Sequence, residues 1–194
     1  MDGRILYNPL AVLGKGKGFL AAIVVVIALT AVACWGGVHL APLYPQLSSE
    51  RPSAMVIIGE SLVAWLTLGF LLLAFAKVSR GNSGLGAHLA AAGLSRFPYI
   101  LAAIVMSRQL LGKAILEAMR ARGGESIIRS QAILTPGLII AGFAILGLVI
   151  WAIVILYLGY KQASRLQGGR AAASFVIGVL LAEAISKLLV WLLI

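Results

Sequence analysis

Charged residues are scarce in this sequence, and their scarcity excludes a water-soluble fold. Only 11% of the 194 residues are charged and 61% are hydrophobic, whereas a soluble domain usually carries about 25% charged residues. Most of the chain must therefore be solvated by lipid. The polar connections between the apolar runs are too short to build a second core, so we expect one domain over residues 1–194.

Cysteine is almost absent, and no recognisable catalytic set occurs. Cys34 is the single cysteine, so the chain offers no internal disulfide and no Cys/His metal cluster. His39 and His88 lie far from one another and from acids at metal-binding spacing, which predicts surface or interfacial residues rather than ligands. No Ser/His/Asp set, paired acids or HExxH motif occurs, so we expect a non-enzymatic protein without metal or cofactor.

Acidic residues are few, with six Asp and Glu against sixteen Lys and Arg, for a net charge of +10. In a soluble protein this balance would suggest a nucleic-acid partner. Here the cations stand between apolar runs, where each is attracted to anionic lipid headgroups by about 1 kcal/mol. We therefore expect membrane lipids as partners and no nucleic acid.

Long apolar runs are what the sequence does contain. About 20 such residues suffice to cross the hydrocarbon core of a bilayer. The predicted spans cover residues 18–40, 55–76, 85–106, 132–160 and 171–194. They predict an all-α, polytopic transmembrane helical bundle.

The third predicted span is interrupted by proline. Pro98 removes a helical hydrogen bond and disfavours helix at Phe97, so we expect a break near Arg96. The first half should form an interfacial helix, and the second half a short span.

A charged helical pattern follows the third span. Residues 107–122 place apolar side chains on one helical face and most charges elsewhere, which predicts an amphipathic helix lying on the membrane surface. Its expected contacts with lipid headgroups are Arg108, Lys113, Arg120 and Arg122.

Three charges fall inside the second and fifth predicted spans. Glu60 lies about 7.5 Å into the second span and Lys187 about 10 Å from the end of the last, at about 1.5 Å per residue. The cation distribution between loops slightly favours four spans, but only five spans place these two charges at one depth. Glu183 stands one helical turn before Lys187. We expect Glu60, Glu183 and Lys187 to form a structural charge cluster, with a proton path or lipid contact as alternatives.

Several short motifs occur in an order that resembles the Yip family of Ypt/Rab-interacting membrane proteins, in its bacterial form. The motif residues Gly93, Arg96 and Pro98 belong to a glycine, aromatic, proline pattern that opens the third span. The other matching segments are Tyr7-Asn8-Pro9, Ala76-Lys77, Gly81-Asn82-Ser83-Gly84, Trp151, Leu156, Gly159-Tyr160 and Ala171.

The resemblance implies five membrane helices, a cytoplasmic N-terminus and residence in a bacterial inner membrane. The long polar N-terminal region of eukaryotic members is missing, so we expect no Rab-type GTPase partner. Three functions remain open: a Yip-type organiser of membrane or partner proteins, an accessory or structural subunit of a larger membrane complex, and a small transporter or channel. A transporter is typically built from internal repeats, which this sequence does not display convincingly.

Overall fold

The structure of this chain, a computed structural model, describes residues 6–41, 44–47, 51–82, 84–107 and 136–193. Within these ranges, five helical segments are long and apolar enough to cross a membrane. They are Gly16–Gly36, Ala54–Val78, Leu85–Met106, Ile139–Ser164 and Gly168–Leu192. The predicted all-α bundle with five membrane segments is confirmed.

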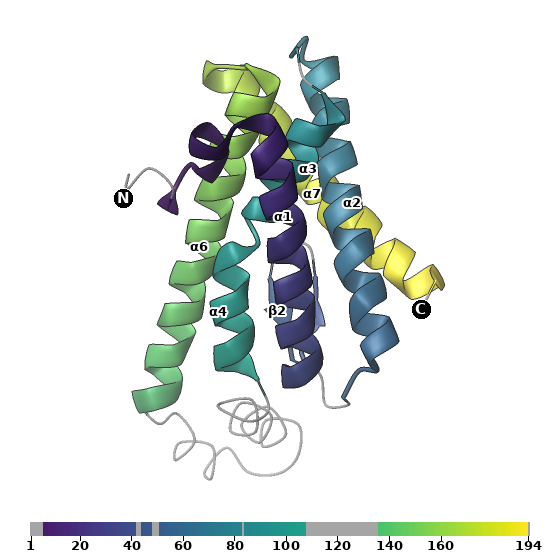
Figure 1. Ribbon diagram of the computed structural model, residues 1–194, viewed down its shortest axis with the longest axis vertical. Coiled ribbons are helices and arrows are strands. Elements are labelled where there is room, and N and C mark those ends of the chain that lie inside the picture. The colour runs from purple at the N-terminus through teal and green to yellow at the C-terminus, as the bar shows by residue number, and fades with distance from the viewer. Residues whose placement is uncertain (1–5, 42–43, 48–50, 83, 108–135, 194) are drawn as a thin grey trace, which may run out of the picture.

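The five segments run alternately between the two ends of the bundle (Figure 1). Helix α1 (Pro9–Gly36) and helix α2 (Ala54–Val78) are joined by a two-stranded hairpin. The third segment consists of α3 (Leu85–Leu94) and α4 (Phe97–Met106), and α6 (Pro136–Ser164) and α7 (Gly168–Leu193) complete the bundle. The start of α1 and the start of α7 lie at one end, and the hairpin lies toward the other.

Helix α1 begins and ends with the residues that its boundaries require. The Asn8 side chain accepts a hydrogen bond from the Ala11 backbone N–H at 3.3 Å, and Pro9 takes the first helical position, where its missing N–H leaves nothing unpaired. At the other end, Gly37 adopts a left-handed conformation with φ of 65° and its N–H caps the Ala33 carbonyl.

The third segment breaks where proline predicts. Helix α3 ends at Leu94 and α4 begins at Phe97, with Pro98 in its first turn. The prediction that the first half is interfacial is wrong, because every residue from Ala87 to Leu94 is buried and α3 contacts α1, α2 and α6. Of this segment, 67% is buried, against 22% for the segment in α6. The broken helix is therefore the centre of the bundle.

The connection after α1 folds back into the bundle as a hairpin. Strand β1 (His39–Leu40) pairs antiparallel with β2 (Pro45–Gln46), with Leu40 opposite Pro45. Leu40 is buried and belongs to a core cluster that also contains Tyr99 of α4. The predicted first span, residues 18–40, ran through this strand, whereas helix α1 ends at Gly36.

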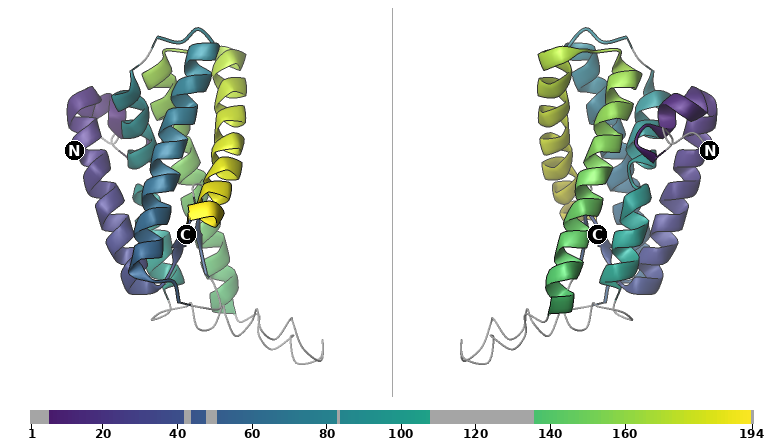
Figure 2. Two further views of the ribbon diagram at one scale, coloured as in Figure 1. Left: turned by 90° about the vertical axis from the view of Figure 1, so that its right-hand side faces the viewer. Right: turned by 90° about the vertical axis from the view of Figure 1, so that its left-hand side faces the viewer.

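The last two helices are packed differently although a short turn joins them. Helix α7 packs mainly against α2, while α6 packs mainly against α3 and α4. The two helices contact one another near the turn that joins them, where the Tyr160 and Ser174 hydroxyl oxygens lie 2.7 Å apart. Figure 2 shows α7 running beside α2 in the left view and α6 on the opposite side of the bundle in the right view. Their outward faces are left uncovered within the described part of the chain.

The predicted surface helix over 107–122 falls almost entirely outside the described residues, of which only Ser107 is a member. Its four expected headgroup contacts, Arg108, Lys113, Arg120 and Arg122, fall outside them too, so this helix and its lipid contacts stay a prediction.

Candidate functional site

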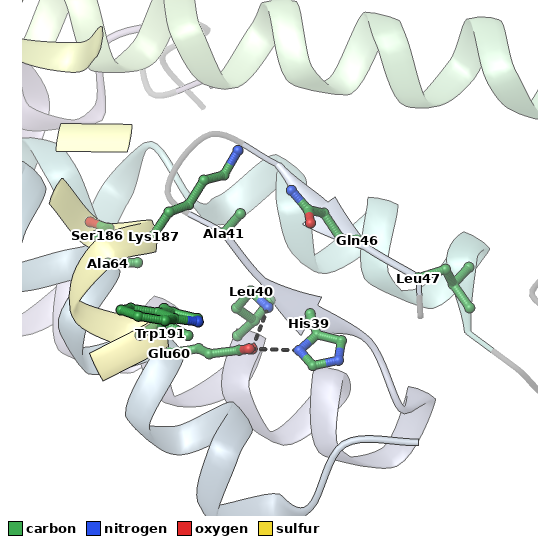
Figure 3. A pocket seen from close by; sticks show the side chains of 11 residues that line it. His39, Leu40, Ala41, Gln46, Leu47, Glu60, Ala64, Ser186, Lys187 and Trp191 are labelled. Carbon is green, nitrogen blue, oxygen red and sulfur yellow. Dashed lines mark hydrogen bonds and ion pairs between the residues drawn. The ribbon is translucent and has the colours of Figure 1, made fainter. Parts of the chain in front are cut away.

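A pocket of about 370 Å³ lies between the hairpin, α2 and α7. This volume is within the range of about 300–1,000 Å³ that small-ligand sites occupy. Most of its wall is apolar, and its polar lining comes from His39, Gln46, Glu60, Ser186 and Lys187 (Figure 3). Two of the three predicted intramembrane charges, Glu60 and Lys187, therefore face one pocket from two different helices.

Glu60 holds the hairpin in place. It lies about 9 Å along α2 from Ala54, at about 1.5 Å per residue, and its side chain is buried. The carboxylate accepts a hydrogen bond from the Leu40 backbone N–H at 3.0 Å and pairs with His39 Nδ1 at 2.6 Å. In lipid an unsatisfied backbone N–H costs several kcal/mol. The Leu40 N–H has no helical carbonyl as a partner, so the Glu60 carboxylate stabilises the strand by accepting its hydrogen bond.

Lys187 pairs within its own helix. Its Nζ lies 2.8 Å from Glu183 Oε1, one turn earlier on α7. The Lys187 side chain is 55% exposed, whereas that of Glu183 is 15% exposed. The ammonium group therefore remains accessible in the pocket while its counter-ion is held inside the bundle.

The pairs Glu60–His39 and Lys187–Glu183 lie around one pocket, and each residue is paired within its own pair. In Figure 3, Lys187 extends toward Gln46 on one side of the hairpin, and Glu60 points to Leu40 and His39 on the other. The predicted cluster of Glu60, Glu183 and Lys187 accordingly stays a proposal, in the form of two neighbouring pairs around one pocket.

One of the two histidines differs from its predicted surroundings, and the other has a partner that the sequence did not indicate. His39 is the partner of Glu60 across 21 positions of sequence, which no helical spacing could indicate. The prediction that His88 is a surface or interfacial residue is wrong, because His88 is fully buried and its ring centroid lies 5.7 Å from that of Tyr160. Position in an apolar run with small neighbours was the available signal for burial of His88.

Ser186 is a pocket residue that the sequence did not single out. Its side chain is 1% exposed, and its Oγ has no hydrogen-bond partner among the described residues. A buried hydroxyl that lines a pocket without a partner can donate to a bound group.

The three motif residues meet at the break in the third segment. A Cβ on Gly93 would lie 2.5 Å from the Ala22 Cβ, so only glycine permits this approach of α3 to α1. Arg96 is 1% exposed, and its three guanidinium nitrogens find no hydrogen-bond partner in the described ranges. Pro98 occupies the first turn of α4. Gly93 and Pro98 thus shape the helix break, and Arg96 places a cation inside it.

In the described part of the chain, four apolar helices pack around a buried, broken third segment, and this arrangement defines a multi-pass α-helical membrane protein. The sequence matches the family model described as the Yip1 domain over residues 13–190. This match covers nearly the whole chain, which therefore belongs to the Yip1 family, as its motifs suggested. No curated protein and no solved structure matches the chain.

Proposed function

We propose that this protein is a non-enzymatic organiser of its membrane, which holds lipids or partner membrane proteins against the outward faces of α6 and α7. The observation that carries this proposal is that these two helices pack mainly against different neighbours. Helix α7 packs against α2, and helix α6 packs against the third segment. Each therefore presents an apolar face that its neighbours within the described chain do not cover.

Named side chains show how apolar these faces are. Phe143 of α6 is 71% exposed and Leu180 of α7 is 61% exposed. Between transmembrane helices there is no hydrophobic driving force beyond that toward lipid tails, so a partner is held by packing and by hydrogen bonds. Faces of this kind support contact with lipids, with other membrane subunits, or with both. The bacterial form of the motifs favours an inner membrane as the location.

Site-specific photo-crosslinking in membranes tests the proposal. A photoreactive residue at Phe143 or Leu180 should give discrete adducts, either one protein or one enriched lipid class. The matched control is Val24, which is 66% exposed on α1, and which should give only the bulk lipid mixture. If Phe143 and Leu180 give the same mixture as Val24, the proposal is wrong. A single stoichiometric protein adduct would assign the chain to a larger membrane complex.

A further inference from the structure

We propose that the pocket between the hairpin, α2 and α7 binds the headgroup of a zwitterionic phospholipid whose cation is a primary ammonium, as in phosphatidylethanolamine. This inference rests on the proposed function and names the lipid that the protein would hold. The pocket is lined by side chains of opposite charge at separate places, with apolar walls between them.

The α7 side of the pocket offers donors for a phosphate. The Lys187 ammonium has three N–H donors, and its pair with Glu183 leaves donors free on a side chain that is 55% exposed. The neighbouring Ser186 hydroxyl lacks a partner among the described residues, and Gln46 adds an amide on the hairpin. A phosphate diester has the acceptor oxygens and the negative charge that such a group of donors requires.

The α2 side offers an acceptor for an ammonium. A carboxylate has about four lone-pair positions, and the hydrogen bonds of Glu60 to His39 and to the Leu40 N–H occupy two of them. A primary ammonium can donate to the remaining positions. A quaternary ammonium has no N–H, so we expect ethanolamine to be preferred over choline.

The position of the pocket suits a lipid rather than a soluble ligand. Trp191 both lines the pocket and is 78% exposed, so the opening lies on the flank of the bundle where lipid surrounds α7. Helix α2 has 25 residues and is therefore about 37 Å long, which exceeds a hydrocarbon core of about 30 Å. When the excess of about 7 Å is shared between the two ends of the helix, Glu60, about 9 Å from its start, lies about 5 Å inside the edge of that core.

Lipid titration of the full chain in detergent tests this inference. The unfolding temperature should rise more with dioleoyl phosphatidylethanolamine than with the phosphatidylcholine or phosphatidylglycerol of the same chains. Lys187→Gln and Ser186→Ala should each lower the affinity for the ethanolamine lipid about tenfold, because a hydrogen bond to a charged group contributes about 1.5–3 kcal/mol. The control Lys77→Gln, on an exposed lysine in the last turn of α2, should bind as the unchanged chain does.

A charge variant tests the ammonium end. Glu60→Gln keeps an acceptor for the Leu40 N–H, so the hairpin can remain, but it should abolish the preference for ethanolamine over choline. If Glu60→Gln fails to fold, the Lys187 and Ser186 variants still decide the question.

Three outcomes would overturn the inference. These are equal stabilisation by the three lipids, unchanged binding in both α7 variants, and binding of soluble phosphoethanolamine as tight as that of the lipid. Crosslinking at Phe143 and Leu180 is measured independently. Discrete adducts without lipid preference would leave the proposed function standing and remove this inference. Selective lipid binding without such adducts would support the lipid in this pocket and contradict the part of the proposed function that places partners on the outward faces of α6 and α7.

Discussion

The Glu60 carboxylate accepts the backbone N–H of Leu40 at 3.0 Å, inside a bundle of apolar helices. This contact holds the second transmembrane helix against a strand of the preceding loop, which folds back into the bundle. It explains why an acid is kept within a span that otherwise carries no charge until Lys77, near its end.

Removal of the Glu60 carboxylate should destabilise the hairpin that it holds. Glu60→Ala leaves the Leu40 N–H and His39 without their acceptor, and we expect the free energy of unfolding to fall by about 3 kcal/mol. Glu60→Gln should lose less, since the amide oxygen still accepts the Leu40 N–H. Unfolding by SDS in mixed micelles measures both values. Leu66→Ala, at an exposed position of α2, is the control, and equal losses for the Ala and Gln variants would contradict the explanation.

The pair on α7 should behave as a unit. Lys187→Met leaves the partly buried Glu183 without its cation, so it should destabilise the bundle more than Lys187→Met combined with Glu183→Gln. Because Lys187 is more than half exposed, we expect a difference of only about 1 kcal/mol. Adding Glu60→Gln to the double variant tests whether Glu60 takes part in the predicted cluster. Equal stability of the single and double variants would show that the ion pair does not matter.

Gly93 should not accept a side chain. Gly93→Ala places a Cβ 2.5 Å from the Ala22 Cβ and 3.1 Å from its Cα, and overpacking of this kind costs about 1–3 kcal/mol. The matched control is Gly142→Ala, where a Cβ meets no atom of the described chain within 4 Å. Helix propensity should make that change neutral or slightly stabilising. Thermal unfolding compares the two, and a Gly93→Ala variant as stable as Gly142→Ala would refute the close approach.

Arg96 should be a source of instability. Its guanidinium is buried without a hydrogen-bond partner in the described part of the chain, and a charge at membrane depth costs about 2.5–3.5 kcal/mol. Arg96→Met keeps much of the volume and should raise the free energy of unfolding by about 2 kcal/mol. Arg170→Met, on an exposed arginine at the start of α7, should change little. A large loss of stability in Arg96→Met would show that the cation is stabilised where it lies.

The two ends of the chain should lie on opposite sides of the membrane, with the C-terminus outside. The alternation of the five described segments and the cytoplasmic N-terminus that the family resemblance implies lead to this expectation. An alkaline phosphatase fused after Ile194 should be active, and one inserted at Gln167, in the turn between α6 and α7, should be inactive. Activity of both fusions, or of neither, would contradict the five-span topology.

Features that depend on neighbouring residues could be predicted from the sequence. Run length predicted the five spans, and Pro98 predicted the break before α4, because a proline acts on the helix turn that contains it. The pairing of Glu183 with Lys187 follows equally from helical geometry, since residues four apart share a face.

Which apolar face turns inward was decided only by the tertiary structure. Leu72 is fully buried and Phe143 is 71% exposed, yet both stand in uniformly apolar helices. In water, hydrophobicity separates an inner face from an outer one, but lipid is as apolar as the bundle interior, so composition carries no such signal. For the same reason the sequence did not predict the burial of His88 and α3, or the contact of Glu60 with a hairpin 20 positions away. Those contacts come from helix packing, which local sequence periodicity does not encode.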